Sequence, residues 1–246
     1  AGILSASLGR LGSLESVVTQ MAMAIQHRGP DDAGVWSDDQ MGVALGHRRL
    51  SILDLSPAGH QPMASAGGRY VIAFNGEIYN HLELRGLLRS ARNDGEWRGH
   101  SDTETLLACF GTWGVEKTLE SAVGMFAIAL WDRETRTLTL ARDRMGEKPL
   151  YYGWQGDTFL FGSELKALRA HPAFRAEVDR GSLALLLRHN YVPAPYSIYE
   201  GIRKLPAGTY MQLRPGQREV EPVAYWSLAE VAERGMASPF FGSDED

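Results

Sequence analysis

The sequence predicts an α+β domain in which two antiparallel sheets are packed together and covered by helices. Strand-like segments come in closely spaced pairs: 125–132 and 137–143 flank a polar turn of four residues, and 150–154 and 158–162 flank one of three. Connections this short allow only antiparallel pairing. Residues 70–74 and the first of these strands are apolar on both faces. We therefore expect two sheets stacked on each other with helices outside.

The remaining elements follow from the spacing of apolar residues. Further strands are expected at 34–36, 43–48, 70–74 and 208–213. Helical spacing predicts helices at 14–26, 81–90, 103–111, 164–170 and 183–189. Ser101 and Glu104 have the spacing of a capping box and are expected to begin the third of these helices. Such helices, grouped around antiparallel hairpins, are typical of a layered α+β domain.

Composition excludes several classes of protein. The 246 residues are 44% hydrophobic and 22% charged, which is ordinary for a globular chain. With 25 Lys and Arg against 30 Asp and Glu, the net charge is −5, and the basic residues are dispersed. No nucleic-acid partner is therefore expected. The longest apolar run, 123–131, is nine residues, whereas a membrane span needs about 20. No signal peptide is visible, so no membrane partner and a cytoplasmic location are expected.

Cysteine and histidine patterns argue against redox and metal sites. Cys109 is the only cysteine, which excludes an internal disulfide and a CxxC site. It continues the apolar stripe that Leu106 and Phe110 give a predicted helix, so we expect a buried structural thiol rather than a nucleophile. None of the seven histidines has HxxxH or HExxH spacing. No metal site is expected, and the lack of a phosphate-binding glycine loop argues against ATP binding by this chain.

Four short segments are denser in polar and conformationally special residues than folding requires: 1–3, 47–52, 75–80 and 99–104. Asn75 and Gly76 follow an apolar strand directly. A side-chain amide and the adjacent backbone N–H can converge on one oxygen, as in an oxyanion hole. A plain Asn-Gly turn is the alternative, and the local sequence alone favours the turn.

Two charged residues suggest a pocket for an amino acid. The planar guanidinium of Arg49 could hold a carboxylate through two hydrogen bonds, although for an isolated arginine a surface ion pair is the favoured interpretation. Asp102 lies in the first turn of a predicted helix, where the helix dipole favours it, but it could also accept from an ammonium group. Taken with the oxyanion donors, these groups describe a site for a free amino acid with a reacting carbonyl.

The combination of motifs resembles a known family. The segments that carry the resemblance lie at 28–31, 49–52, 75–80, 101–104, 143–152, 163–168 and 204–208. They resemble the glutaminase domain of glutamine-dependent asparagine synthetases, a class II glutamine amidotransferase of the N-terminal nucleophile hydrolase fold. The matches run in order from residue 1 to about residue 226. Pro30 and the 75–80 string favour the asparagine synthetase branch over other branches of the class.

The resemblance implies a fold, a reaction and a partner. The fold would be a four-layer αββα sandwich. The reaction would be hydrolysis of L-glutamine to glutamate and ammonia, with the ammonia passed to an ATP-dependent C-terminal synthetase domain. Residues 1–234 would form the glutaminase domain and 235–246 a linker toward that second domain. No cofactor is expected in the glutaminase domain, and ATP and Mg²⁺ only in the synthetase domain. A homodimer and the identity of the amidated acceptor are left open.

The resemblance also implies residue roles. Arg49 would bind the glutamine carboxylate, and Asp102 with Glu77 would receive the ammonium. The predicted catalytic positions are Ala1, Asn75 and Gly76, the last two as oxyanion donors, and backbone groups near Leu50 and Ile52 would line the pocket.

Position 1 departs from the family, which has cysteine there. A terminal cysteine supplies a thiolate and an α-amine whose ordinary pKa of about 7.7–8.0 suits a base. Ala1 lacks the sulfur, so this chain is expected to bind glutamine without turnover. It is either an introduced Cys-to-Ala exchange or a naturally degenerate domain kept for glutamine sensing or as an interface. Retention of every other pocket residue favours the first.

Overall fold

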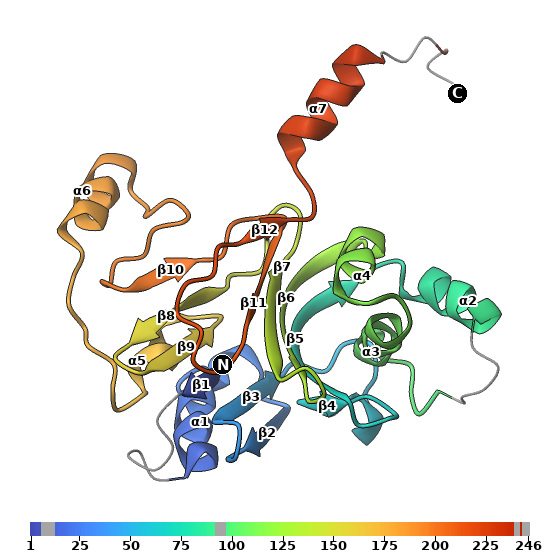
Figure 1. Cartoon of the computed structure of the whole chain (residues 1–246), viewed down its shortest axis with the longest axis horizontal. Helices are drawn as coiled ribbons and strands as arrows, with labels where there is room; N and C mark the ends of the chain where they lie inside the picture. The colour runs from blue at the N-terminus through green and yellow to red at the C-terminus, as the bar shows by residue number, and fades with distance from the viewer. Residues whose placement is uncertain (6–12, 92–96, 239–241, 243–246) are drawn as a thin grey trace.

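The structure is a computed structural model that describes residues 1–5, 13–91, 97–238 and 242. In this part of the chain two six-stranded antiparallel sheets are stacked (Figure 1). The first sheet has the order β10-β8-β9-β1-β3-β2 and contains β1 (Gly2–Ser5), β2 (Asp32–Asp38), β3 (Val43–Arg49), β8 (Tyr151–Gln155), β9 (Thr158–Gly162) and β10 (Ile202–Lys204). The second has the order β12-β11-β7-β6-β5-β4 and contains β4 (Met63–Ala64), β5 (Tyr70–Ile78), β6 (Gly124–Asp132), β7 (Thr137–Arg142), β11 (Thr209–Leu213) and β12 (Val223–Ala224).

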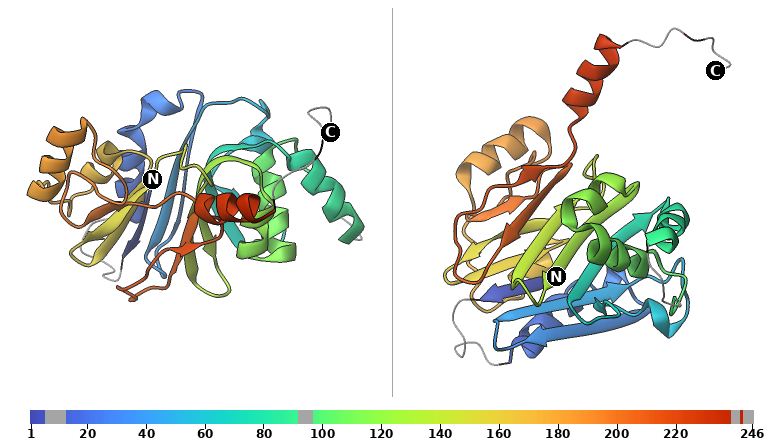
Figure 2. Two further views of the ribbon diagram at one scale, coloured as in Figure 1. Left: turned by 90° about the horizontal axis from the view of Figure 1, so that it is seen from above. Right: turned by 45° about the vertical axis from the view of Figure 1, so that its right-hand side comes forward.

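Helices cover the outer face of each sheet. On the first sheet lie α1 (Leu14–Met23) and α5 (Leu165–Arg169), and on the second lie α2 (His81–Ala91), α3 (Asp102–Trp113) and α4 (Val115–Ser121) (Figure 2). Two further helices are α6 (Arg180–His189) and α7 (Leu228–Ala237), and short 3₁₀ helices occupy Gln26–Arg28 and Pro57–Gly59. The predicted α+β sandwich of two antiparallel sheets with helical outer layers is confirmed.

The central strands owe their position to apolar residues on both faces. On β6, Phe126 and Ile128 pack with the helices outside the second sheet. The alternate residues Ala127, Ala129 and Trp131 pack between the two sheets. This alternation is the two-sided burial that the sequence predicts for this strand.

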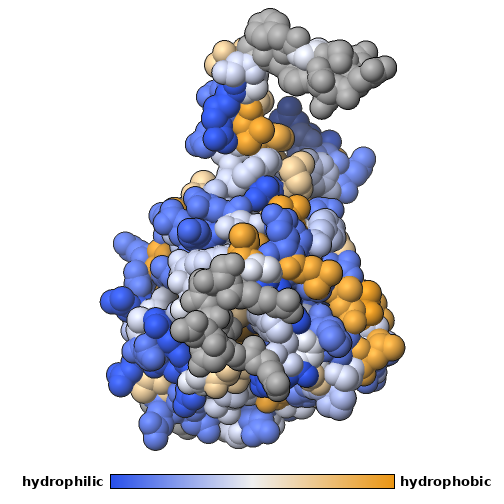
Figure 3. Space-filling model, turned by 90° about the vertical axis from the view of Figure 1, so that its right-hand side faces the viewer, coloured by the Kyte–Doolittle hydropathy of each residue, from blue (hydrophilic) through white to orange (hydrophobic). Residues whose placement is uncertain are grey.

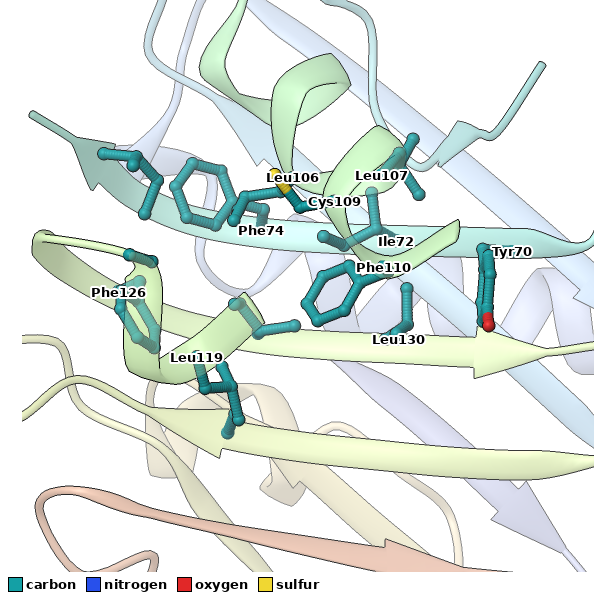
Figure 4. Packing of buried hydrophobic residues seen from close by; sticks show 14 of the residues in the cluster. Tyr70, Ile72, Phe74, Leu106, Leu107, Cys109, Phe110, Leu119, Phe126 and Leu130 are labelled. Carbon is teal, nitrogen blue, oxygen red and sulfur yellow. The ribbon is translucent and has the colours of Figure 1, made fainter. Parts of the chain in front are cut away.

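Helix α3 packs its apolar stripe on the second sheet. Cys109 is fully buried there, beside Phe110 and Leu106 (Figure 4). Ser101 is the N-cap, and its hydroxyl accepts the backbone N–H of Glu104 at 3.3 Å. The predicted cap and the buried thiol are both confirmed.

Strand β5 is longer than the sequence predicts. It continues through Asn75 and Gly76 to Ile78, and these residues stay paired with β6. The interpretation of Asn75-Gly76 as a turn is therefore wrong. Glycine is required at position 76 for a different reason, since a Cβ there would lie 2.1 Å from the Met125 carbonyl oxygen of β6.

The last helix stands away from the sandwich. Helix α7 buries none of its residues, and Leu228 and Met236 are among its exposed apolar residues. Figure 3 shows apolar side chains, in orange, on this projecting part of the molecule. Helix α7 runs across the predicted domain boundary at 234/235, which stays a prediction. Of the expected linker, residues 239–241 and 243–246 lie outside the described residues. No helix in the described part of the chain is long and apolar enough to span a bilayer.

Candidate active site

The site is built along an open edge of β5. The neighbouring strand β4 pairs only with Val71 and Ile72, so β5 has no strand partner beyond them on that side. Side chains satisfy its backbone instead. The N–H of Phe74 donates to Gln61 Oε1 at 2.7 Å, and the Phe74 carbonyl accepts from His47 Nε2 at 3.0 Å.

The same edge continues toward α3. The N–H of Ile78 donates to Asp102 Oδ2 at 2.9 Å. Because backbone groups alternate between the two edges of a strand, Gly76, midway between Phe74 and Ile78, directs its N–H to this open edge as well. The side chains of Asn75 and Glu77 alternate with these backbone groups. The end of β5 thus places backbone and amide N–H donors and the carboxylate of Glu77 around the same cavity.

This cavity has a volume of about 240 Å³. All seven residues that the sequence predicts for glutamine and oxyanion binding line it: Arg49, Leu50, Ile52, Asn75, Gly76, Glu77 and Asp102. The side chains of Leu50 and Ile52 are themselves 56% and 62% exposed. Residues from the end of β3, the end of β5 and the start of α3 are therefore brought together although they are far apart in the sequence.

Arg49 is held by the loop that follows it. Its Nη1 donates to the Ser56 carbonyl at 3.2 Å, and its Nη2 donates to the Asp54 carbonyl. Gly59 lies against the guanidinium, where a Cβ would be 2.0 Å from Nη2. These contacts use two of the five N–H donors of the guanidinium. The other N–H groups have no hydrogen-bond partner among the described residues, so they are available to a carboxylate that enters the cavity.

Asp102 is a buried carboxylate, 5% exposed. Burial raises the pKa of its carboxyl above the ordinary value, and the nearby Glu77 adds to the rise, whereas hydrogen bonds from the Ile78 and Thr103 backbones oppose it. A carboxylate that is costly to ionise gains most from a positive group in contact with it. The cavity is thus suited to an ammonium group beside Asp102.

A buried arginine fixes the start of α3. Arg85 donates to the Ser101 carbonyl at 2.9 Å, to the Gly99 carbonyl at 3.1 Å and to the Thr105 hydroxyl at 2.8 Å. Its guanidinium also lies 4.0 Å from the centre of the Trp97 ring. Because Ser101 directly precedes Asp102, these bonds set the position of the carboxylate.

Residue 1 lies beside the larger cavity, not in its wall. The α-amine of Ala1 donates to the Gly46 carbonyl at 2.9 Å, and Gly46 N–H donates to the Ala1 carbonyl at 2.7 Å. Burial lowers the pKa of this amine to about 5. Ala1 lines a second cavity of about 60 Å³. The two cavities share the wall residues Arg28, His47, Arg48, Phe74 and Asn75.

Sequence reasoning missed three residues of this site, namely His47, Gln61 and Ser163. The first two bind the edge of β5, and the Ser163 hydroxyl accepts from Asn75 Nδ2 at 3.3 Å. Two of them had a signal in the sequence: Ser163 lies in a segment that carries the family resemblance (163–168), and His47 begins the polar segment 47–52. No pattern in the sequence marks Gln61.

Within the described ranges, no group of three or more His, Cys, Asp or Glu side chains is arranged to hold a metal ion. The polar groups that line the cavity are hydrogen-bond donors and carboxylates, and they are not grouped as metal ligands would be. They suit a small zwitterion.

Comparison with known proteins identifies the family. A sequence model of the glutamine amidotransferase domain matches residues 1–226. Asparagine synthetase [glutamine-hydrolyzing] 3 of Bacillus subtilis is 39% identical over 199 residues, covering 78% of this chain and 31% of the relative. Asparagine synthetase [glutamine-hydrolyzing] 1 of the same organism is 36% identical over 208 residues, covering 85% and 32%. The chain spans less than half the length of the curated relatives it matches.

A solved structure supports the fold. Glutamine phosphoribosylpyrophosphate amidotransferase from B. subtilis superposes with a TM-score of 0.66 at 17% identity, covering 92% of this chain and 48% of that one. At this identity the likeness concerns the fold alone. It agrees with the two stacked antiparallel sheets found here, and the family match extends over residues 1–226. The chain therefore belongs to the class II glutamine amidotransferase domains, among the homologues of asparagine synthetases.

Proposed function

We propose that this domain binds L-glutamine in the 240 Å³ cavity and that, in the form shown here, it does not hydrolyse it. With cysteine at position 1, the same site would release ammonia for amidation of a carboxylate by a C-terminal synthetase domain. The observation that carries the proposal is the gathering of all seven predicted pocket residues around one cavity, with residue 1 directly behind its wall.

The charges of the cavity match those of a free amino acid. Arg49 would hold the α-carboxylate through its free guanidinium donors. Asp102, aided by Glu77, would accept the α-ammonium, whose charge offsets the cost of the buried carboxylate. The side-chain amide would then extend along β5 toward Asn75 and Gly76. Asn75 Nδ2 and the Gly76 N–H would donate to its oxygen, most strongly once that oxygen becomes an anion.

Residue 1 supplies the base of the proposed reaction but not its nucleophile. Its amine has a pKa of about 5 and is therefore neutral at pH 7, as a base must be. With cysteine, the amine would take the thiol proton, sulfur would attack the amide carbon, and ammonia would leave with that proton. Water would then cleave the thioester to glutamate. Ala1 offers no sulfur, so no acyl intermediate can form, and the rate should fall by orders of magnitude, about 10⁶ in a serine protease.

Calorimetry on the unchanged chain tests the binding step. We expect one L-glutamine per chain and no release of ammonia, and D-glutamine serves as the control because its ammonium and carboxylate cannot both reach their partners. Absence of L-glutamine binding would refute the proposal.

The exchange Ala1→Cys, with residue 1 as a free N-terminus, tests the reaction. We expect equal amounts of glutamate and ammonia at an enzymatic rate, with Ala1→Ser as the matched control. An inactive Ala1→Cys chain that still binds glutamine would instead support a degenerate, glutamine-sensing domain.

The role of the C-terminal part rests on the relatives, whose names describe glutamine-hydrolysing asparagine synthetases. In this proposal ATP and Mg²⁺ act there, and L-glutamine and that domain are the partners of the residues described here. Asparagine synthesis is the default reaction. Amide formation by the full-length protein with a panel of carboxylates, aspartate first, tests it.

A further inference from the structure

Residue 1 lies between two glycines on the neighbouring strands of its sheet. Strand β1 is flanked by β3 and β9. On one side, Gly46 exchanges two backbone hydrogen bonds with Ala1. On the other, the pairing of β1 with β9 brings Gly162 opposite, where an added Cβ would be 3.5 Å from the Cβ of Ala1. The next residues along the two flanking chains are His47 and Ser163.

Both of these residues reach across to β5 in the other sheet. His47 Nε2 lies 3.0 Å from the Phe74 carbonyl oxygen. Asn75 Nδ2 lies 3.3 Å from Ser163 Oγ. The first bond holds the peptide that joins Phe74 to Asn75, and the second holds the side-chain amide of Asn75. The backbone and the side chain of Asn75 are thus both tied to the two strands that flank residue 1.

The protonation state of His47 follows from its partner. A carbonyl oxygen only accepts, so Nε2 carries the proton and Nδ1 the lone pair. Nδ1 is buried and finds no partner among the described residues. Burial, reinforced by the charge of the nearby α-amine, lowers the pKa of His47 to about 4. At pH 7 the ring is therefore a neutral donor to β5.

We propose that His47 and Ser163 are positioning residues that align the Asn75 amide with residue 1. The inference rests on the proposed function, in which Asn75 donates to the oxyanion. Neither residue needs to touch glutamine, because each acts through Asn75. A misplacement of about 1 Å at a catalytic group can cost about 10²-fold in rate, so small errors in this alignment lower turnover while leaving the binding contacts of Arg49 and Asp102 intact.

The first experiment measures glutamine hydrolysis by the Ala1→Cys chain. His47→Leu removes the donor and should lower kcat about 10- to 100-fold, with KM changed less than threefold. His47→Gln keeps an N–H donor at a similar reach and should recover most of kcat. The matched control is His171→Leu, since His171 is also buried with a pKa lowered to about 4 but lines neither cavity. It should leave kcat unchanged.

Ser163 provides a second, independent variant. Ser163→Ala should lower kcat with KM unchanged, and Ser163→Thr, which retains a hydroxyl, should restore it. A loss of kcat in Ser163→Ala that Ser163→Thr does not restore would contradict a role of the hydroxyl. Because Ser163 is only half-buried, its variants also test the proposal if His47→Leu fails to fold.

A double-mutant cycle tests whether His47 acts through Asn75. Asn75→Ala should itself lower kcat by about 10²–10³, and adding His47→Leu should then lower it little further, since the group being aligned is gone. Unchanged kcat in His47→Leu, or the same fold loss with and without Asn75, would overturn the proposal.

A readout without turnover separates this inference from the proposed function. If the Ala1→Cys chain is inactive, the proposed function fails, and the alignment is tested in the Ala1 chain by ¹⁵N NMR. His47→Leu and Ser163→Ala should each shift the side-chain amide resonances of Asn75. Resonances that stay in place in both variants would refute the alignment.

Discussion

The carboxylate of Asp102 accepts the backbone N–H of Ile78 at 2.9 Å, which links the first turn of α3 to the open edge of β5. Among the described residues, none of the ion pairs made by arginine or lysine involves this buried carboxylate. Burial raises the pKa of the Asp102 carboxyl. The free site therefore carries an electrostatic cost that a bound ammonium group would relieve.

Asp102→Asn should stabilise the free domain and weaken glutamine binding. The raised pKa means that the folded state holds the Asp102 proton more tightly than the unfolded chain, so this group lowers stability as pH rises through the raised pKa. Asparagine keeps the acceptor for Ile78 without the charge. We expect a higher melting temperature at pH 7 and at least a tenfold loss of glutamine affinity, since a hydrogen bond to a charged group contributes about 1.5–3 kcal/mol. Calorimetry and thermal unfolding check both, and a variant that binds as tightly as the parent would contradict the role.

Arg49→Lys should weaken glutamine binding about as much as Arg49→Ala. Lysine keeps the charge but loses the planar fork, and with it the ability to bind the Ser56 carbonyl and a carboxylate together. The expected loss is at least about tenfold, for a charge-assisted hydrogen bond. Arg203→Lys, at an exposed position of β10, is the matched control. Full affinity in Arg49→Lys would mean that charge alone suffices.

Stability should rise with pH between about pH 4 and 8. Burial lowers the pKa of the Ala1 amine to about 5 from 8.0, and those of His47 and His171 to about 4 from 6.5. In this window the unfolded chain binds more protons than the folded one, which makes the slope positive. At pH 6.5 unfolding should take up about two protons, nearly one on the amine and about half on each histidine. Urea unfolding at several pH values measures this uptake, and a flat profile would contradict buried neutral groups.

Cys109 should be inert until the domain unfolds. Burial raises the pKa of its thiol to about 12, so almost no thiolate exists at pH 7. We expect thiol reagents to label it only at the rate of unfolding. Cys109→Ala should cost about 1 kcal/mol through a small cavity and leave glutamine binding unchanged. Rapid labelling of the native chain would show that the helix stripe opens easily.

The sequence predicts the fold best where a run of apolar residues leaves only one structural interpretation. Strand β6 is apolar on both faces, for example at Phe126 and Ala127, which predicts that both faces are covered, and the structure shows this. The pocket residues are predicted through motifs of the family, because contacts between distant segments cannot be predicted from the residues of one segment alone. Asn75-Gly76 misled the local interpretation because strand pairing with β6 outweighed a turn preference. His47 could not be assigned, because its partner Phe74 lies in another sheet.

Because the site uses the open edge of β5, it depends on which residues of the strand direct their backbone groups to that edge. Phe74 and Ile78 meet the site through backbone groups, so exchanging their side chains does not remove those groups, whereas Gly76 between them has no room for a side chain. A slip of one residue in the register between β5 and β6 would point the backbone N–H and C=O groups of Phe74, Gly76 and Ile78 toward β6. The backbone groups of Asn75 and Glu77 would then lie at the open edge instead. A single-residue insertion between Tyr70 and Phe74 could therefore abolish the site while every pocket side chain is still encoded. This kind of damage is invisible to a motif search.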